Sequence, residues 1–544
     1  MIIIQNKGKI HFSARPVTVK SFIGKFILLL NGLRTAGLVL FLFFLHCSKP
    51  MKTYTNPIIH ADYSDPDVVA VDDDYYMTSS SFAHTPGLPV LHSRDLVNWE
   101  ILGYALENLP DSTYNEPLHG KGVWAPAIRY HQGEFRIYYG DPDFGIYMVK
   151  SKKPTGPWEK PILVTAGKGL IDPCPFWDED GKAYLLHAWA KSRAGFNSLL
   201  TLKPMNDDGT QVIGEGVLVF DGHENQPTIE GPKMYKRQGY YYIFAPAGGV
   251  KKGWQTVLRS KNIYGPYEDK ILLEQGSTDI NGPHQGAWIE TRFGESWFIH
   301  FQDKDAYGRV VHLNPIRWLN DWPLMGQDWD GNGIGEPVTT YQRPKSSPGI
   351  AQYHLPTSDE FNDQKPGLQW QWEGNHSENW YSLSENPDNL RLYAQPFPAN
   401  NLWESAAIIG QKFPLEEFDV IVKIESRADR AGLVILGSDY STIALTSDSN
   451  YNYIQYSECL DADHGTSEHR LLQIEIPLQR AFLKIEVRKS AFCRFYYSLD
   501  GKEYKTAGPG FQARKGRWVG AKIGLYALGS GYADFDFCRI NKHE

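Results

Sequence analysis

The feature that most constrains the fold is a repeated strand opening along residues 65–290. Each unit has a short apolar strand, a turn rich in Asp or Gly, and then an aromatic strand. The units open at Asp65, Trp124, Asp172, Glu230 and His284, and successive openings lie roughly 50 residues apart. Five such units, each with three or four strands, are the expected content of a five-bladed β-propeller.

The placement of the five opening residues predicts a site. In a propeller the innermost strand of every blade runs along the central channel, so residues that open these strands face one another. Three of the five are acids, Asp65, Asp172 and Glu230, and Trp124 and His284 fill the other two places. We therefore expect an acidic constellation at one mouth of the channel.

A second domain follows the repeats. Residues 341–356, YQRPKSSPGIAQYHLP, read as a linker because prolines and serines interrupt any strand. Beyond it, segments such as FDVIVKIES from Phe418 and FLKIEVRK from Phe482 alternate apolar and polar residues with period two, which is typical of a β-sandwich. We predict an all-β chain with an export segment at 1–46, the propeller at 55–340, and a jelly-roll β-sandwich at 357–544.

The N-terminal segment resembles an export signal. A basic region containing Lys25 and Arg34 precedes the apolar run AGLVLFLFFL of residues 36–45, and Cys47 follows it. This order is typical of a lipoprotein signal rather than a spanning helix, although His46 departs from the usual small residue. We expect an exported protein, periplasmic or tethered to the outer membrane through a lipid on Cys47.

Composition excludes some classes and leaves others open. Aromatic residues make up 13% of the chain, which suits both β-sheet cores and stacking on sugar rings. The formal net charge is -8, and no basic cluster exceeds short lysine pairs, so nucleic acid is not an expected partner. The five cysteines show no metal-ligand spacing, and neither a disulfide framework nor a zinc site follows from them.

The three acids suit one kind of chemistry. Hydrolysis of a glycosidic bond needs a carboxylic acid that protonates the leaving oxygen and a carboxylate that attacks or activates water. Mutual repulsion and partial burial would raise the pKa of one acid and keep it protonated. Asp65 and Asp172 each precede a proline, where a single Asp is more often a turn former. Their recurrence at equivalent openings favours the functional interpretation.

A series of motifs then identifies a family resemblance. Over residues 55–340 the chain contains, in this order, NPIIHADYSDPDVV, VWAPAIRY, GLIDPCPFWDEDGKAYL, TIEGPKMYKRQGYYYIFAPAGG and GPHQGAW. Together they resemble glycoside hydrolase family 43, and the C-terminal part resembles the concanavalin-like sandwich of its β-xylosidase-type members. The resemblance implies inversion of the anomeric configuration, with Asp65 as general base and Glu230 as general acid. Asp172 would orient Glu230 and tune its pKa.

The same resemblance implies further site residues. Phe82 and Trp124 match the aromatic walls of a terminal-sugar pocket, and Arg309 matches a basic residue that meets sugar hydroxyls. His284 matches a central histidine that often lies near a channel cation such as calcium. The chemistry itself requires no cofactor. Taken alone, each of these residues is as easily explained by core packing or by a structural ion pair.

The expected activity is exo-release of terminal β-D-xylose or α-L-arabinofuranose from plant hemicellulose or pectin side chains. The substrate would be an oligosaccharide or polysaccharide, and the sequence leaves the oligomeric state open. Three alternatives remain: another terminal sugar such as galactose, a retaining fructan or sucrose hydrolase on a similar propeller, and a non-catalytic glycan-binding lipoprotein. The retaining enzymes match the motifs less well, and the presence of all three acids argues against a binding-only protein.

Overall fold

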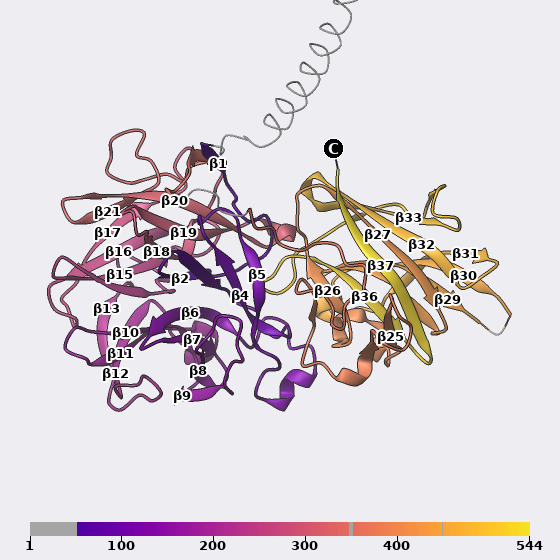
Figure 1. Ribbon diagram of the computed structural model, residues 1–544, viewed down its shortest axis with the longest axis horizontal. Helices are drawn as coiled ribbons and strands as arrows, with labels where there is room; N and C mark the ends of the chain where they lie inside the picture. The colour runs from indigo at the N-terminus through magenta and orange to yellow at the C-terminus, as the bar shows by residue number, and fades with distance from the viewer. Residues whose placement is uncertain (1–51, 348–351, 449, 544) are drawn as a thin grey trace, which may run out of the picture. The chain divides into compact units, whose positions relative to one another are not determined.

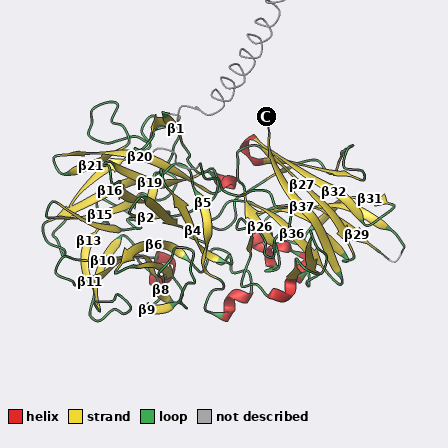
Figure 2. Ribbon diagram, viewed as in Figure 1, coloured by secondary structure: helices red, strands yellow, loops and turns green. Residues whose placement is uncertain are grey.

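The computed structural model describes residues 52–347, 352–448 and 450–543. Its regular structure is almost entirely β-strand, and the chain from Thr53 onward forms one compact unit (Figures 1 and 2). The predicted export segment and Cys47 lie outside the described residues. Within those residues, no helix combines the length and the apolar character needed to cross a membrane.

Five four-stranded antiparallel sheets form the first part of the unit, and each consists of four successive strands. The first two blades contain β2 (Asp67–Val71), β3 (Asp74–Thr78), β4 (Gly87–Ser93) and β5 (Glu100–Leu106), then β6 (Trp124–His131), β7 (Glu134–Asp141), β8 (Gly145–Ser151) and β9 (Ile162–Ala166). The third and fourth contain β10 (Leu170–Trp177), β11 (Ala183–Trp189), β12 (Leu199–Met205) and β13 (Val217–Asp221), then β14 (Lys233–Arg237), β15 (Tyr240–Ala247), β16 (Trp254–Ser260) and β17 (Glu268–Leu273). The fifth contains β18 (His284–Glu290), β19 (Ser296–Asp303), β20 (Arg309–Leu319) and β21 (Trp322–Met325).

The five sheets close into a ring. The first strand of blade 1, β2, contacts the first strands of both blade 2 and blade 5, which are β6 and β18. Each blade begins at or beside one of the five openings read from the sequence. The predicted five-bladed propeller is therefore confirmed.

Apolar side chains on both faces of each blade build the propeller core. Neighbouring residues of a strand point to opposite faces, so Leu185 of β11 packs towards blade 2 whereas Leu186 packs towards blade 4. Similar clusters lie between blades 1 and 2, 4 and 5, and 5 and 1. The blade strands are therefore runs of apolar residues in the sequence and do not alternate regularly between apolar and polar residues.

A short sheet ties the ends of the propeller together. β1 (Thr53–Thr55) pairs with β22 (Thr340–Gln342), so the stretch predicted as a linker begins inside a strand. The buried Asn56 amide reinforces this closure, because its Nδ2 donates to the carbonyl oxygens of Leu313 and Val338 at 2.8 and 2.7 Å.

The second part of the unit is a sandwich of two sheets. The seven-stranded sheet runs in the order β23 (Gln371–Trp372), β26 (Ile409–Lys412), β36 (Lys522–Leu528), β28 (Arg430–Leu436), β29 (Tyr440–Ser447), β30 (Asn452–Cys459) and β31 (His469–Ile476). The eight-stranded sheet runs β24 (Tyr381–Ser382), β25 (Leu390–Tyr393), β37 (Tyr532–Lys542), β27 (Phe418–Ser426), β32 (Arg480–Arg488), β33 (Phe492–Ser498) and β34 (Lys505–Thr506), with β35 (Phe511–Gln512) beside β33.

One apolar core joins the two sheets, and it includes Leu433 of the first and Val420 and Ile485 of the second. Burial alternates along β27 as the period-two pattern predicted. Helices are short: α2 (Lys191–Ala194), and the 3₁₀ turns η2 (Ser112–Asn115), η3 (Asp305–Tyr307), η4 (Glu378–Trp380), η5 (Pro398–Asn400), η6 (Leu402–Glu404), η7 (Ala462–His464) and η8 (Lys489–Ala491).

The sandwich is packed directly against the propeller. Ala306, Tyr307 and Val310 of blade 5 belong to the same apolar cluster as the sandwich core. The Tyr307 hydroxyl donates to the carbonyl oxygen of Glu416 at 2.8 Å, and the Ala521 N–H donates to the carbonyl oxygen of Ala306 at 2.7 Å. Sandwich residues can therefore reach the mouth of the propeller channel.

A buried polar cluster also lies at this interface. Lys522 of β36 is paired with Glu373, which follows β23, and His84 and His119 of the propeller approach the same carboxylate. Burial lowers the pKa of both histidines, to about 4 for His119. Burial alone would raise the pKa of Glu373, but Lys522, His84 and His119 together outweigh it and hold this pKa well below its ordinary value.

Candidate active site

The three acids lie where the inner strands begin, and their backbone is unusual. Asp65 precedes β2, Asp172 is near the start of β10, and Glu230 precedes β14. Asp65 and Asp172 both have φ of 55°, a left-handed conformation that costs energy for residues other than glycine and collects at functional sites. The β10–β11 register also shifts between Ile171 and Cys174. Such a bulge turns a side chain out of the ladder, here Asp172.

Asp65 is buried and receives two polar contacts. The Ser80 hydroxyl donates to its Oδ2 at 2.5 Å, and Ser80 Oγ in turn accepts the Ala125 N–H at 2.7 Å. Arg309 at the start of β20 places Nη1 3.2 Å from Asp65 Oδ1. The structure thus joins the predicted base to the predicted sugar-binding arginine. Both contacts are donated to the carboxylate and fix its position, as a general base requires.

Asp172 is the most deeply buried of the three acids, with 2% of its surface exposed. Its Oδ2 accepts the Gly231 N–H at 2.7 Å and the Gln285 side-chain amide at 3.0 Å. Burial, and then the negative charges of Glu230 and Asp65, raise the pKa of Asp172 well above its ordinary value. The set of three acids therefore keeps a proton at a pH at which separate carboxylic acids are ionised, as general-acid chemistry needs.

Glu230 is the accessible member of the group, because 32% of its side chain is exposed. Its Oε1 lies 2.9 Å from Nε2 of His284, the first residue of β18. The main-chain N–H of Glu230 donates to the carbonyl oxygen of Pro246 at 3.1 Å. The glutamate is held from both its backbone and its carboxylate, yet it can reach a bound molecule.

His284 was also predicted to lie near a channel cation. Its side chain is buried, and Nδ1 has no hydrogen-bond partner among the described residues. The groups of His, Cys, Asp and Glu in the described part of the chain that could hold an ion do not include His284. Calcium takes six to eight oxygen ligands, and the imidazole of His284 supplies none. We therefore assign no catalytic step to a calcium ion.

Two predicted aromatic walls stand together beside the acids. Phe82 has φ of 52° and belongs to a loop that pairs with Val123 through two hydrogen bonds of 3.0 Å. Its ring lies 6.5 Å from that of Trp124, edge to face. The Trp124 indole N–H donates to the carbonyl oxygen of Gly120 at 3.0 Å, so the ring direction is fixed.

A third aromatic residue comes from the sandwich. Trp518, in the loop between β35 and β36, lies edge to face 6.1 Å from the ring of Trp124. The Arg309 guanidinium stands 5.9 Å from the centre of the Trp518 ring. Asp62 fixes this arrangement, because its Oδ1 accepts the main-chain N–H of Arg309 and its Oδ2 accepts the main-chain N–H of Gly520, both at 2.9 Å. Two blades and the sandwich therefore contribute to one aromatic row.

A large cavity opens next to this row. It lies between blades 4 and 5 and the sandwich, has a volume of about 860 Å³, and includes Arg309 and Trp518 in its lining. Its remaining walls mix apolar residues with charged ones such as Lys251, Lys304 and Arg514. The three acids are not part of the lining, so the cavity adjoins the site and does not contain it.

Sequence reasoning missed four residues of this arrangement: Ser80, Gln285, Trp518 and Asp62. Gln285 is adjacent to His284, and Ser80 lies in the run SSS before Phe82, so closer inspection of each motif could have suggested them. Asp62 lies just upstream of Asp65 in DYSDPD. No local signal marks Trp518, because it belongs to the other domain.

Comparison with known proteins places the chain. Residues 54–323 match the model of "Glycosyl hydrolases family 43", and residues 358–541 match "Beta xylosidase C-terminal Concanavalin A-like domain". A putative beta-xylosidase of Xylanibacter ruminicola is 39% identical over 87% of this chain and 86% of that relative. A non-reducing end alpha-L-arabinofuranosidase of Bacteroides ovatus is 32% identical over 75% of this chain and 78% of that relative.

A solved structure agrees with these relatives. The crystal structure of a mutant family 43 protein from Bacillus licheniformis superposes with a TM-score of 0.79, at 27% identity, over 90% of this chain and 100% of that one. The fold, the three acids at the blade openings and these relatives lead to one conclusion. The chain belongs to glycosyl hydrolase family 43 and is a glycoside hydrolase that acts on carbohydrate.

Proposed function

We propose that the protein is an inverting, exo-acting glycosidase that removes one terminal pentose from a xylan-type or arabinan-type chain. The observation that carries this proposal is the aromatic row formed by Phe82, Trp124 and Trp518 beside the acids. Aromatic faces provide apolar surface for the carbon face of a sugar ring, and Arg309 supplies donors for hydroxyl groups at the same place.

We propose a role for each acid from its contacts and its exposure. Asp65, held by Ser80 and Arg309, takes a proton from the attacking water. Glu230, the exposed acid, protonates the leaving oxygen. Asp172 keeps a proton in the group through its raised pKa and holds the Gly231 N–H next to Glu230. In-line attack by water inverts the anomeric carbon, for which the base and acid carboxyls should stand roughly 6.5–9.5 Å apart.

Exo-action is supported by the position of the sandwich loop. An endo-acting enzyme needs an open groove through which the polymer passes on both sides of the cleaved bond. Here Trp518 stands against Trp124 and Arg309, and the Gly520 N–H anchors its loop to Asp62. We infer that this wall obstructs the passage of a continuous chain and admits only a chain end.

The relatives supply the two leading sugars. One is named a putative beta-xylosidase and another an alpha-L-arabinofuranosidase. β-D-Xylose and α-L-arabinofuranose place hydroxyls in similar positions, so one pocket can accept both. We propose terminal β-D-xylose as the main substrate, with arabinofuranose as the second.

A substrate panel tests the proposal. Nitrophenyl β-xyloside, α-arabinofuranoside and β-galactoside are compared by kcat/KM, with xylo-oligosaccharides as natural substrates. We expect the two pentosides to exceed the galactoside by at least about 100-fold, because a pocket that rejects an extra group discriminates by a few kcal/mol. Xylose should appear alone at early times. A mixture of internal fragments, or a preference for galactoside, would contradict the proposal.

We also propose that the mature protein is lipid-tethered through Cys47. The support is the order of basic region, apolar run and cysteine in the sequence. Export in the native bacterium should place the protein in the membrane fraction, and Cys47→Ala should release or mislocalise it. Incorporation of labelled palmitate into the wild type but not into Cys47→Ala would support the tether, and equal labelling would contradict it.

A further inference from the structure

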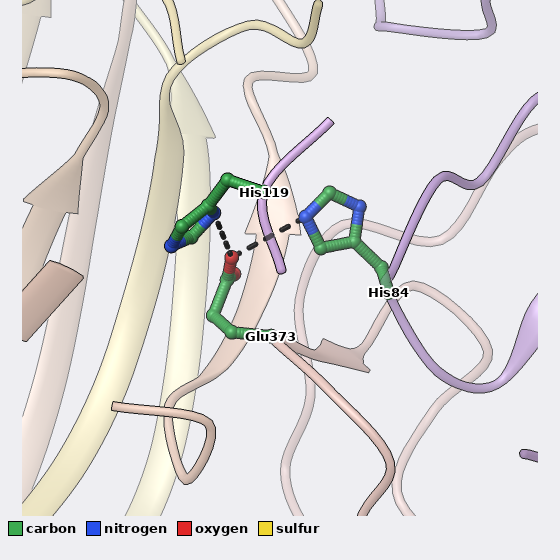
Figure 3. Close-up of side chains that lie close together, drawn as sticks. All are labelled: His84, His119 and Glu373. Carbon is green, nitrogen blue, oxygen red and sulfur yellow. Dashed lines mark ion pairs between the residues drawn. The ribbon is translucent and has the colours of Figure 1, made fainter. Parts of the chain in front are cut away.

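Three metal-ligand side chains that are distinct from the three acids converge at the interface between propeller and sandwich. His84 comes from the loop between β3 and β4, His119 from the loop between β5 and β6, and Glu373 from the sandwich. Figure 3 shows both imidazoles approaching the same carboxylate oxygen from different sides. Glu373 Oε2 lies 3.3 Å from His84 Nε2 and 3.8 Å from His119 Nδ1.

One hydrogen bond of His119 shows which ring nitrogen is protonated and which has a free lone pair. Nε2 lies 2.8 Å from the carbonyl oxygen of Trp403. Because a carbonyl oxygen only accepts, Nε2 carries the proton, and Nδ1 of the neutral ring has a free lone pair. That lone pair faces Glu373 Oε2. A metal-binding histidine commonly donates its other N–H to a main-chain carbonyl in this manner.

The carboxylate has an unsatisfied oxygen at the same point. Glu373 is 1% exposed, and its Oε2 has no hydrogen-bond partner among the described residues. Its other oxygen, Oε1, accepts a hydrogen bond from Lys522. A buried carboxylate oxygen without a partner is costly. A cation placed between Oε2 and the two imidazoles would remove that cost.

We propose that His84, His119 and Glu373 bind one divalent transition-metal ion, with Zn²⁺ as the best match. Zinc accepts imidazole nitrogen and carboxylate oxygen at about 2.0–2.2 Å, so neighbouring ligand atoms of a tetrahedral site stand roughly 3.3 Å apart. The ligand atoms here all lie within 4.8 Å of one another. Water would complete the coordination. The charge of Lys522 opposes the ion and sets an upper limit on its affinity.

Such an ion would be structural and would hold the loops that carry the aromatic residues of the active site. His84 is two residues from Phe82 in one loop, and His119 precedes the segment that carries Trp124. Thr85 and Trp372 already form a β-bridge next to His84 and Glu373. The metal would clamp two pocket-bearing loops of the propeller to the sandwich. It would not contact substrate.

Metal content of the purified full-length chain tests this inference. The protein is stripped with dipicolinate, incubated with Zn²⁺ and desalted, and zinc is counted by mass spectrometry. We expect one zinc per chain and a melting temperature that rises with Zn²⁺ concentration by mass action. Co²⁺ serves as a spectroscopic probe and should give the intense visible absorption of four- or five-coordinate nitrogen–oxygen ligation. A folded chain that retains no zinc, or shows only weak six-coordinate Co²⁺ absorption, would overturn the inference.

Matched variants locate the ion. His119→Gln and Glu373→Gln should each lower zinc affinity by about 100-fold or more, since even outer-sphere partners are worth 10–100-fold. The controls are His376→Gln and His464→Gln, which belong to the two more accessible groups of potential ligands. These should leave the stoichiometry unchanged. Loss of zinc in a control, with full binding in the buried variants, would overturn the assignment. If a buried variant does not fold, the Co²⁺ spectrum of the wild type decides.

Discussion

Replacing Asp172 with Asn should slow catalysis and should also stabilise the folded protein at neutral pH, because it removes a buried carboxyl that is costly to ionise. The substitution removes the charge and keeps the shape. Asn Oδ1 can still accept the Gly231 N–H that Asp172 Oδ2 accepts at 2.7 Å. The same Asn oxygen can also accept the Gln285 side-chain amide, which donates to Asp172 Oδ2 at 3.0 Å. No hydrogen bond need be lost, so the change isolates the ionisable group.

The sign of the stability effect follows from the raised pKa of Asp172. A carboxyl with a raised folded-state pKa contributes stability that is fully present below its unfolded pKa, near 3.8, and is lost as the pH rises through the folded value. The loss amounts to about 1.4 kcal/mol per pH unit within that window. Asn does not titrate, so Asp172→Asn should gain on the wild type as the pH rises from 4 to 7. The value of kcat should fall by about 10²–10⁴-fold.

Asp141 offers a matched control. Burial raises its pKa to about 6, it bonds to the Tyr114 hydroxyl at 2.7 Å, and it does not touch the acids. Asp141→Asn should gain up to about 3 kcal/mol over the same range with kcat unchanged. Urea unfolding at pH 4, 5.5 and 7 and steady-state kinetics measure both effects. A stability difference for Asp172→Asn that does not change with pH, or wild-type kcat, would refute the reasoning.

Three further predictions concern single side chains. Ser80→Ala removes the hydroxyl that positions the base and should lower kcat by about 10–100-fold, the value of a hydrogen bond to a charged group. The control is the adjacent Ser79→Ala, whose buried hydroxyl has no partner in the described structure and whose loss should lower kcat much less in the same assay. Trp518→Ala should lower kcat/KM on xylobiose by about 10-fold, and Trp329→Ala, 64% exposed, should not; equal effects would exclude Trp518 from the pocket. Burial lowers the pKa of His187 to about 4, so its contribution to stability is complete above pH 6.5 and is lost as the pH falls to about 4. His187→Gln should flatten this part of the pH–stability curve by about 3 kcal/mol in chemical denaturation, and an unchanged slope would contradict the assignment.

The propeller could be predicted because its sequence repeat corresponds to the blade, so the number of repeats gives the number of blades. Each blade supplies the same opening, strand and turn, and the five openings coincide with the five inner strands. The sandwich was predictable for another reason. Its strands have one face in a shared core, so period-two burial along β27 is visible as alternation in the sequence.

The site could be predicted only where it follows the repeat. Asp65, Asp172 and Glu230 lie at equivalent blade openings, so their meeting follows from the fold. The left-handed backbone at Asp65 and Asp172 is not visible, because Asp before proline is equally typical of an ordinary turn.

Contacts between the domains could not be derived from the sequence. Trp518 stands beside Trp124, and Glu373 beside His84, although hundreds of residues separate each pair. Nothing local marks them, since docking of the sandwich depends on the shapes of two finished surfaces. The polar partners of the interface, such as Asp62 with Gly520, become apparent only in the structure.

The dependence of the Glu230→Gln variant on the leaving group tests the central claim most directly. Xylobiose has a poor leaving group that needs a proton, whereas dinitrophenyl β-xyloside has one that departs without it. If Glu230 is the general acid, Glu230→Gln should lose at least about 10³-fold in kcat/KM on xylobiose and keep most of its activity on the dinitrophenyl substrate. Asp65→Asn should lose activity on both, because water still needs its base. Equal losses on both substrates for Glu230→Gln would contradict the account.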